Sequence, residues 1–274
     1  MIKKMLLCFM CMSLFLSIPG CKKAPPEVPE IPIPPTTQSI TVISSSNLLY
    51  IGISETFTAT ATMSDGTIKA VVGGVWGGDN PTVATVEAAT GKVTIVGSGT
   101  VNIFVTYGGK QGSKAIRGLP NYQGSWSGSY IIVSCSATGD WAVIDFCSLV
   151  PVGTVLPTNL VLIQDQDRVQ GNFRLGQLGA DTSGPVQTDG QLLLTGTIQG
   201  DITMEVSWRL QSTTPGQITG SLSQIWRMTG YSGNGQLSCN IRDLNRTSTM
   251  TLGPGAPRVM TPTLKDFIRA LMRR

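Results

Sequence analysis

The sequence contains no histidine, and this absence removes several classes of function at once. Catalysis by a Ser-His-Asp or Cys-His arrangement needs an imidazole to accept and return a proton. Zinc sites with histidine ligands are excluded for the same reason. Composition leaves catalysis by carboxylates, lysine or tyrosine open, so those groups must be judged from their surroundings.

Charge is also scarce, since only 13% of the residues are charged and the net charge is +4. The first twenty residues hold two lysines and no acid, so the rest of the chain carries 18 bases against 16 acids. A nearly neutral balance argues against an extended nucleic-acid footprint. We therefore expect no nucleic-acid partner. We also expect no cofactor.

Glycine is abundant, with 32 residues, and 41% of the chain is hydrophobic. Abundant glycine together with recurrent Thr and Ser is typical of short strands joined by tight turns. The hydrophobic fraction is sufficient for packed cores, so global disorder is not expected. The composition predicts an all-β protein.

Residues 1–20 have the layout of an export signal, with Lys3 and Lys4 ahead of an apolar run from Met5 to Ile18. That run is shorter than the roughly 20 apolar residues that a membrane-spanning helix needs. An N-terminal membrane anchor that stays uncleaved is the alternative.

The next residues favour cleavage. The tetrapeptide Ile-Pro-Gly-Cys at 18–21 resembles the bacterial lipobox, although Pro19 stands where Ala or Ser is usual. The resemblance implies that Cys21 is acylated and becomes the first residue of a membrane-anchored protein. Lys22 and Lys23 follow in place of Asp, which by the enterobacterial sorting rule favours the outer membrane over the inner.

Residues 21–38 comprise this cysteine and a proline-rich stalk. Six prolines between 22 and 38 exclude helix and sheet. We expect a semi-rigid polyproline II spacer that reaches on the order of 50 Å. A docking site for a proline-binding domain is the less favoured alternative.

Residues 39–120 alternate polar and apolar side chains in several runs separated by turn signals, which predicts a β-sandwich of about seven strands. The segment resembles the bacterial immunoglobulin-like group 2 domain through an ordered series: Gly52, Asp65-Gly66, Val75-Trp76, Asn80–Val86, Thr90–Val93 and Gly97–Val101. Gly77-Gly78 departs from the family, which more often has Ser after the Trp. The resemblance implies a non-catalytic spacer or recognition module of surface proteins.

Two residues of this domain have expected structural roles. Trp76 is best explained as a core residue, and Gly91 as the positive-φ position of a hairpin. The domain should be bounded by the stalk and by residues 118–120, where few contacts are expected to cross.

Residues 121–253 contain six strand-like runs of similar length, which favours an up-and-down antiparallel barrel or a curled sheet. The runs are 159–164, 169–175, 191–198, 202–210, 218–226 and 235–242. The triplet Gly124-Ser125-Trp126 resembles the G-x-W motif of lipocalins, which implies a carrier with an open lumen for a small apolar ligand. A barrel filled by its own side chains is the favoured alternative.

Three cysteines lie in this second domain and would face an oxidising envelope. We expect a disulfide between Cys135 and Cys147, which would contribute roughly 3 kcal/mol by constraining the unfolded chain. Cys239 lies in a strand-like run and should be buried and inert.

Four acids of the second domain are candidate metal ligands or catalytic carboxylates. These are Asp165, Asp167, Asp181 and Asp189. Each has turn-forming neighbours and none has the spacing of a calcium loop, so we expect turn roles, no metal site and no catalytic residues.

Residues 254–274 read as a proline-containing linker and a short basic helix capped by Thr263. Apolar residues at helical spacing would form one face: Leu264, Phe267, Ile268, Leu271 and Met272. Lys265, Arg269, Arg273 and Arg274 supply the basic part. The helix either packs across the barrel or binds a membrane or a partner.

The sequence thus favours a non-enzymatic envelope lipoprotein for adhesion, recognition or scaffolding, with a protein or glycan partner at the cell surface. A lipocalin-like carrier is the second hypothesis. The expected architecture is an immunoglobulin-like sandwich, an antiparallel barrel or curled sheet, and a short C-terminal helix.

Overall fold

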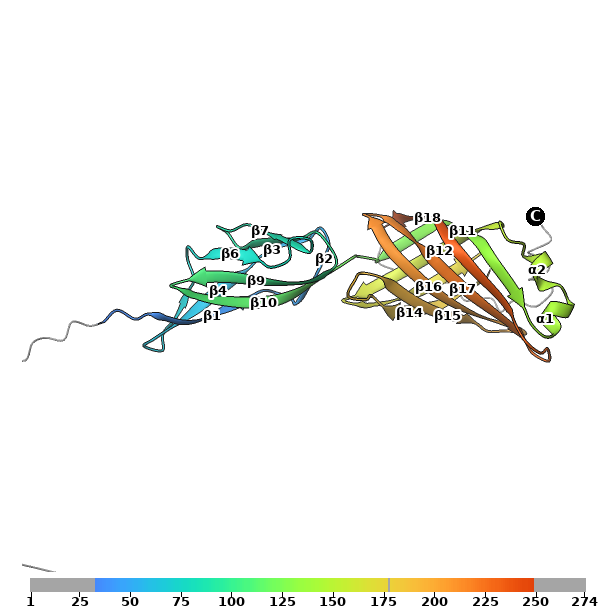
Figure 1. Ribbon diagram of the computed structural model, residues 1–274, viewed down its shortest axis with the longest axis horizontal. Coiled ribbons are helices and arrows are strands. Elements are labelled where there is room, and N and C mark those ends of the chain that lie inside the picture. The colour runs from blue at the N-terminus through green and yellow to red at the C-terminus, as the bar shows by residue number, and fades with distance from the viewer. Residues whose placement is uncertain (1–32, 177, 249–274) are drawn as a thin grey trace, which may run out of the picture. The chain divides into compact units, whose positions relative to one another are not determined.

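The computed structural model describes residues 33–176 and 178–248, which form a β-sandwich followed by a closed antiparallel barrel (Figure 1). Both parts belong to one compact unit that begins at Thr36. This confirms the predicted all-β class, with a β-sandwich ahead of an antiparallel barrel. The expected export signal, Cys21, most of the stalk and the C-terminal helix lie outside the described residues.

The sandwich is built from ten short strands arranged in three small sheets. In chain order they are β1 (Thr37–Ile43), β2 (Leu48–Tyr50), β3 (Ser54–Thr56), β4 (Thr58–Met63), β5 (Ile68–Ala70), β6 (Val75–Gly78), β7 (Ala84–Val86), β8 (Lys92–Ile95), β9 (Gly99–Tyr107) and β10 (Lys110–Leu119). The sheets have the orders β1-β4-β5, β2-β10-β9-β6 and β3-β8-β7. All pairs are antiparallel except β2 with β10, which is parallel.

The alternation of β9 shows why this sequence makes a sandwich. Val101, Ile103 and Val105 point inward and are fully buried, whereas Asn102 between them is exposed. A strand with this pattern must cover its apolar face with another sheet. Each such side chain contributes roughly 1.5–3 kcal/mol by leaving water.

Trp76 lies in this core, as expected, and is 8% exposed. Gly91 faces it with φ +70°, and a Cβ there would lie 2.7 Å from Cε2 of the indole. The glycine is therefore required twice, by the left-handed backbone and by the close approach of the ring.

The barrel consists of eight strands and two short helices between the first two strands. They are β11 (Gly124–Ala137), α1 (Asp140–Val143), α2 (Phe146–Leu149), β12 (Val155–Asp165), β13 (Arg168–Leu175), β14 (Leu178–Pro185), β15 (Leu192–Ile198), β16 (Ile202–Thr214), β17 (Gln217–Met228) and β18 (Gly235–Ser248). Each strand pairs with the next in sequence, and β18 returns to pair with β11. Closure leaves no open sheet edge along the barrel wall.

The interior of the barrel is lined by alternate residues of each strand. In β16 the buried residues are Ile202, Met204, Val206, Trp208 and Leu210. Glu205, Ser207 and Arg209 lie between them and are exposed. The apolar layer from all eight strands forms one continuous core.

Two parts of the barrel differ from the sequence-based expectation. Strand β14 was not expected, because its glycine, Asp, Ser and Pro residues are poor strand formers. Asp181 lies on its exposed face rather than in a turn. The helices α1 and α2 were also not expected, because each spans four residues and shows no helical period.

Candidate functional site

The four acids singled out by sequence do not converge on a site. Asp167 pairs with Arg117, and Asp189 accepts a hydrogen bond from the Gln191 amide within its own turn. Across residues 33–176 and 178–248, no group of three His, Cys, Asp or Glu side chains could hold a metal ion. Asp167 and Asp189 thus have structural roles in separate parts of the barrel.

Three other carboxyl groups have a shifted pKa, and each shift is downward. Hydrogen bonds from Thr67 lower the pKa of Asp65, and hydrogen bonds from Asn102 lower that of Asp79. The Ser232 amide and hydroxyl lower the pKa of Asp140. A carboxylic acid that donates a proton near neutral pH needs the opposite shift, produced by an apolar setting.

Contacts cross the expected domain boundary at 118–120. The Arg117 guanidinium lies 2.9 Å from Asp167 Oδ2 and donates to the Val186 carbonyl at 2.9 Å. Gln164 donates to the Pro120 carbonyl at 3.2 Å. The end of the sandwich is therefore joined to residues at one end of the barrel by one ion pair and two hydrogen bonds.

At this end the barrel is closed around Trp126, the aromatic residue of the lipocalin-like triplet. The Arg246 guanidinium lies 4.6 Å from the centroid of the Trp126 ring, in position for a cation–π interaction. Burial lowers the pKa of Arg246. The Trp126 indole donates to the Tyr122 carbonyl at 2.9 Å.

Tyr122 completes the closure of this end. Its hydroxyl donates to the Gly190 carbonyl at 2.7 Å and accepts from the Ser212 amide at 3.1 Å. Its own amide donates to Gln164 at 2.6 Å. Burial raises the pKa of the phenol to about 12, so the group stays neutral and keeps its hydrogen bonds to Gly190 and Ser212.

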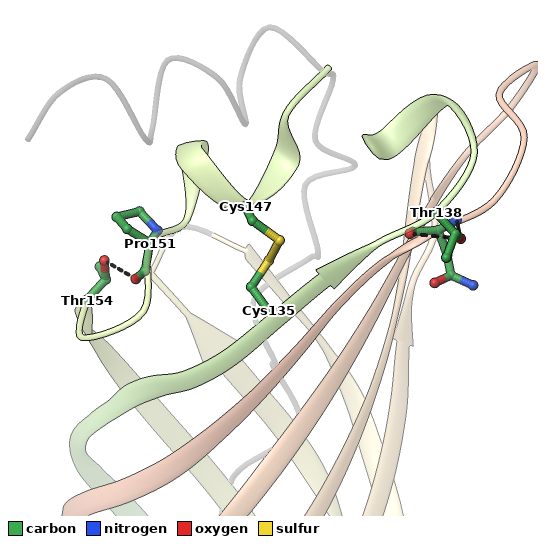
Figure 2. Close-up of a disulfide and its surroundings, with 6 residues drawn as sticks. Cys135, Thr138, Cys147, Pro151 and Thr154 are labelled. Carbon is green, nitrogen blue, oxygen red and sulfur yellow. Dashed lines mark hydrogen bonds between the residues drawn. A yellow bond between two sulfur atoms is a disulfide. The ribbon is translucent and has the colours of Figure 1, made fainter. Parts of the chain in front are cut away.

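The opposite end of the barrel is covered by residues 138–153, which include α1 and α2 and which we call the cap. A disulfide joins Cys147 on α2 to Cys135 near the end of β11 (Figure 2). This is the pair favoured by the sequence. Where the cap returns to the barrel, the Thr154 hydroxyl donates to the Pro151 carbonyl at 2.7 Å.

A second attachment ties the cap to the loop between β17 and β18. The Asp140 carboxylate accepts from the Ser232 amide at 2.6 Å and from its hydroxyl at 2.9 Å. The Thr138 amide donates to the Asn234 carbonyl at 2.9 Å, and the Asn234 amide donates back to the Thr138 hydroxyl at 3.1 Å. The cap is thus attached both to β11 and to the loop between β17 and β18.

Aromatic side chains of the cap pack into the end of the barrel that the cap covers. Phe146 is fully buried, with its ring centroid 5.0 Å from that of Trp141 and 6.2 Å from that of Trp226. Gly235 begins β18 beside it, and a Cβ there would lie 2.5 Å from the Phe146 ring. The missing side chain at 235 is what makes room for the phenylalanine.

A few polar groups lie inside the barrel. Gln224 accepts from the Trp226 indole at 3.2 Å and donates to the Cys239 sulfur at 3.9 Å. Burial raises the pKa of the Cys239 thiol to about 12, so the free cysteine is unreactive. The indole nitrogens of Trp141 and Trp208 are buried without a hydrogen-bond partner within the described chain.

Among the described residues, no helix has the length and apolar character to cross a membrane. No local sequence pattern indicates the cap attachments, because their partners are far apart in the chain. Asp140 and Ser232 are separated by 92 positions, and only the cysteine pair could be found from local spacing.

Comparison with known proteins identifies the first domain. Residues 36–117 match the family of bacterial Ig-like domains (group 2). No curated protein matches the chain. Domains 5–6 of the S-layer protein SbsC are similar at 14% identity and a TM-score of 0.28, with 75% of this chain and 97% of that chain covered. The β-sandwich, although not the barrel, is thus similar throughout to the bacterial Ig-like group 2 family, as its sequence predicts.

Proposed function

We propose that the chain is a non-enzymatic module of the bacterial envelope that serves adhesion, recognition or scaffolding. The observation that carries this proposal is the match of residues 36–117 to a family of bacterial Ig-like domains. The partner would be a protein or a glycan at the cell surface. Acyl chains on Cys21 would hold the module at the membrane, with the outer membrane favoured by Lys22 and Lys23.

The described residues support a binding module more than an enzyme. The carboxyl groups with shifted pKa values are all held in the ionised form by hydrogen bonds. Tyr122 and Cys239 are buried, and burial raises the pKa of each to about 12, which disfavours nucleophilic chemistry near neutral pH.

The anchor is tested by Cys21→Ser in the native host, with Cys11→Ser as the matched control from the apolar run. Palmitate labelling and membrane fractionation should show that only Cys21→Ser loses the label and the membrane association. Retention of both by the Cys21→Ser protein would exclude the lipid anchor.

Recognition is tested with the purified full chain on arrays of glycans and of envelope and host-surface proteins. A hit should be competed by the free chain and should weaken when exposed sandwich residues such as Ile68 and Val72 are changed to Ser. Binding that persists when the exposed sandwich residues are substituted, but is lost when exposed barrel residues are substituted, would contradict the assignment of recognition to the Ig-like domain.

A carrier function is the second candidate, and the buried indole of Trp208 favours it. A buried N–H donor without a partner is costly, and an acceptor on an otherwise apolar ligand would relieve that cost. Native mass spectrometry of the chain purified from its host should then show a retained small molecule. Trp208→Phe keeps an aromatic side chain and removes the donor, so it should lower retention. An empty parent chain would exclude the carrier.

A further inference from the structure

The cap presents a group of exposed apolar side chains, which we call the cap surface. It comprises Val143, Ile144, Leu149 and Val152, which are 83%, 42%, 43% and 61% exposed. Four such residues within ten positions leave an unusual amount of apolar area in water. Apolar area grouped in this way marks a place where another surface binds.

These side chains are exposed although the segment that carries them is firmly attached. Trp141, Phe146 and Val150 alternate with them and are buried in the barrel end. The disulfide between Cys135 and Cys147 and the Asp140 hydrogen bonds fix both halves of the cap. The cap surface is therefore a rigid platform, and a partner that covers it would pay little ordering entropy on the cap side.

The charge of the cap restricts the partner. Between residues 138 and 153 there are two acids, Asp140 and Asp145, and no lysine or arginine. Asp145 is exposed beside the cap surface. An anionic lipid surface would be repelled by these carboxylates, whereas a partner that is both apolar and basic would be attracted.

We propose that the partner is the C-terminal segment of the same chain, residues 263–274, which lies outside the described residues. Its sequence combines the two required properties in one amphipathic pattern. Five apolar residues recur at helical spacing between Leu264 and Met272, and four bases lie among and after them. Residues 263–274 would cover Val143 and its neighbours, with Arg269 or Arg273 opposite Asp145.

The length of the connecting chain is compatible with this placement. Strand β18 starts at Gly235 beside Phe146 of the cap and ends at Ser248, 13 positions later. At about 3.4 Å per residue and a strand tilt of about 40°, the axial distance from Ser248 back to the cap end is about 34 Å. Residues 249–262 span up to about 46 Å when extended, which is sufficient.

The test uses a photo-reactive p-benzoylphenylalanine at position 143 of the purified full chain. Val72 of the sandwich is the matched control, because it is 81% exposed against 83% for Val143. Irradiation should give a product of monomer mass from position 143, joined to a peptide from residues 263–274. Position 72 should give no such product.

Two further variants separate specific docking from chance contact. Phe267→Asp with Leu271→Asp should abolish the cross-link from position 143, and these residues lie beyond the last barrel strand, so the barrel itself is left intact. Asp145→Lys should lower the yield, and adding Arg269→Glu to it should restore part of the loss.

Several outcomes would overturn the proposal. A product of dimer mass would show that a second copy covers the cap surface. Cross-linking to lipid in vesicles of phosphatidylglycerol and phosphatidylethanolamine, without the intramolecular product, would show that a membrane does. Equal yields from positions 143 and 72 would show that residues 263–274 have no preference for the cap.

Discussion

Removal of the Phe146 ring is the sharpest test of how the cap is held. The ring is fully buried against Trp141 and Trp226 at centroid distances of 5.0 and 6.2 Å. Phe146→Ala removes this packing and leaves a cavity in the barrel end, which should lower the free energy of unfolding by about 3–5 kcal/mol. About 0.5–1.5 kcal/mol of that loss reflects each aromatic pair beyond simple burial.

The measurement is urea unfolding of the oxidised chain followed by tryptophan fluorescence, with Ser148→Ala as the control on the same segment. Ser148 is exposed and is not part of the cap surface, so its truncation should change stability by no more than about 0.5 kcal/mol. With a slope of about 2 kcal/mol/M, Phe146→Ala should lower the midpoint by about 1.5–2.5 M. If Phe146→Ala cost less than about 1 kcal/mol, or no more than the control, the ring would not anchor the cap.

Three further predictions concern other parts of the chain. Non-reducing peptide mapping should recover Cys135 linked to Cys147, and a main product that links either of them to another cysteine would refute the pairing. The excised segment 39–120 should melt cooperatively despite losing its barrel contacts, and Trp76→Ala should lower its free energy of unfolding by roughly 3–5 kcal/mol. An excised segment without a cooperative transition would contradict the placement of the domain. A Trp76→Ala segment as stable as the unmodified one would contradict the placement of its core. Because hydrogen bonds lower the pKa of Asp140 in the folded state, its stabilising effect is present above the ordinary value of 3.8 and is lost as the pH falls through the lowered pKa. The protection of amides in the loop between β17 and β18, measured by hydrogen exchange relative to the intrinsic rate at each pH, should therefore fall in acid compared with pH 5, whereas Asp140→Asn should remove most of that fall.

Sequence patterns predicted the fold where alternation was strong. The run 202–210 alternates buried side chains with partly or fully exposed ones, and β16 extends it to Thr214. The pattern failed at β14, whose backbone pairs with β13 although its residues are small and polar. There the neighbouring strand imposes the conformation, and local preference does not reveal it.

The candidate site was less accessible to sequence reasoning than the fold. The disulfide could be inferred because its cysteines are near in sequence and share a loop. The hydrogen bonds of Asp140 with Ser232 and the Arg117–Asp167 ion pair join residues 92 and 50 positions apart, and nothing local identifies either partner. The exposed residues of the cap surface could likewise not be identified from the sequence, because only the structure shows which of their neighbours are buried.

The pairing of β11 with β18 has a consequence for the order in which the chain can fold. The sandwich has all of its strands once β10 has been made, whereas the barrel cannot close until its last strand has been made. Until then β11 presents an unpaired edge, and long-range pairing of this kind is slow because a large loop must be closed first. Barrel maturation therefore depends on the whole chain up to Ser248, so a chain interrupted anywhere in β18 should yield a folded sandwich attached to an aggregation-prone open sheet.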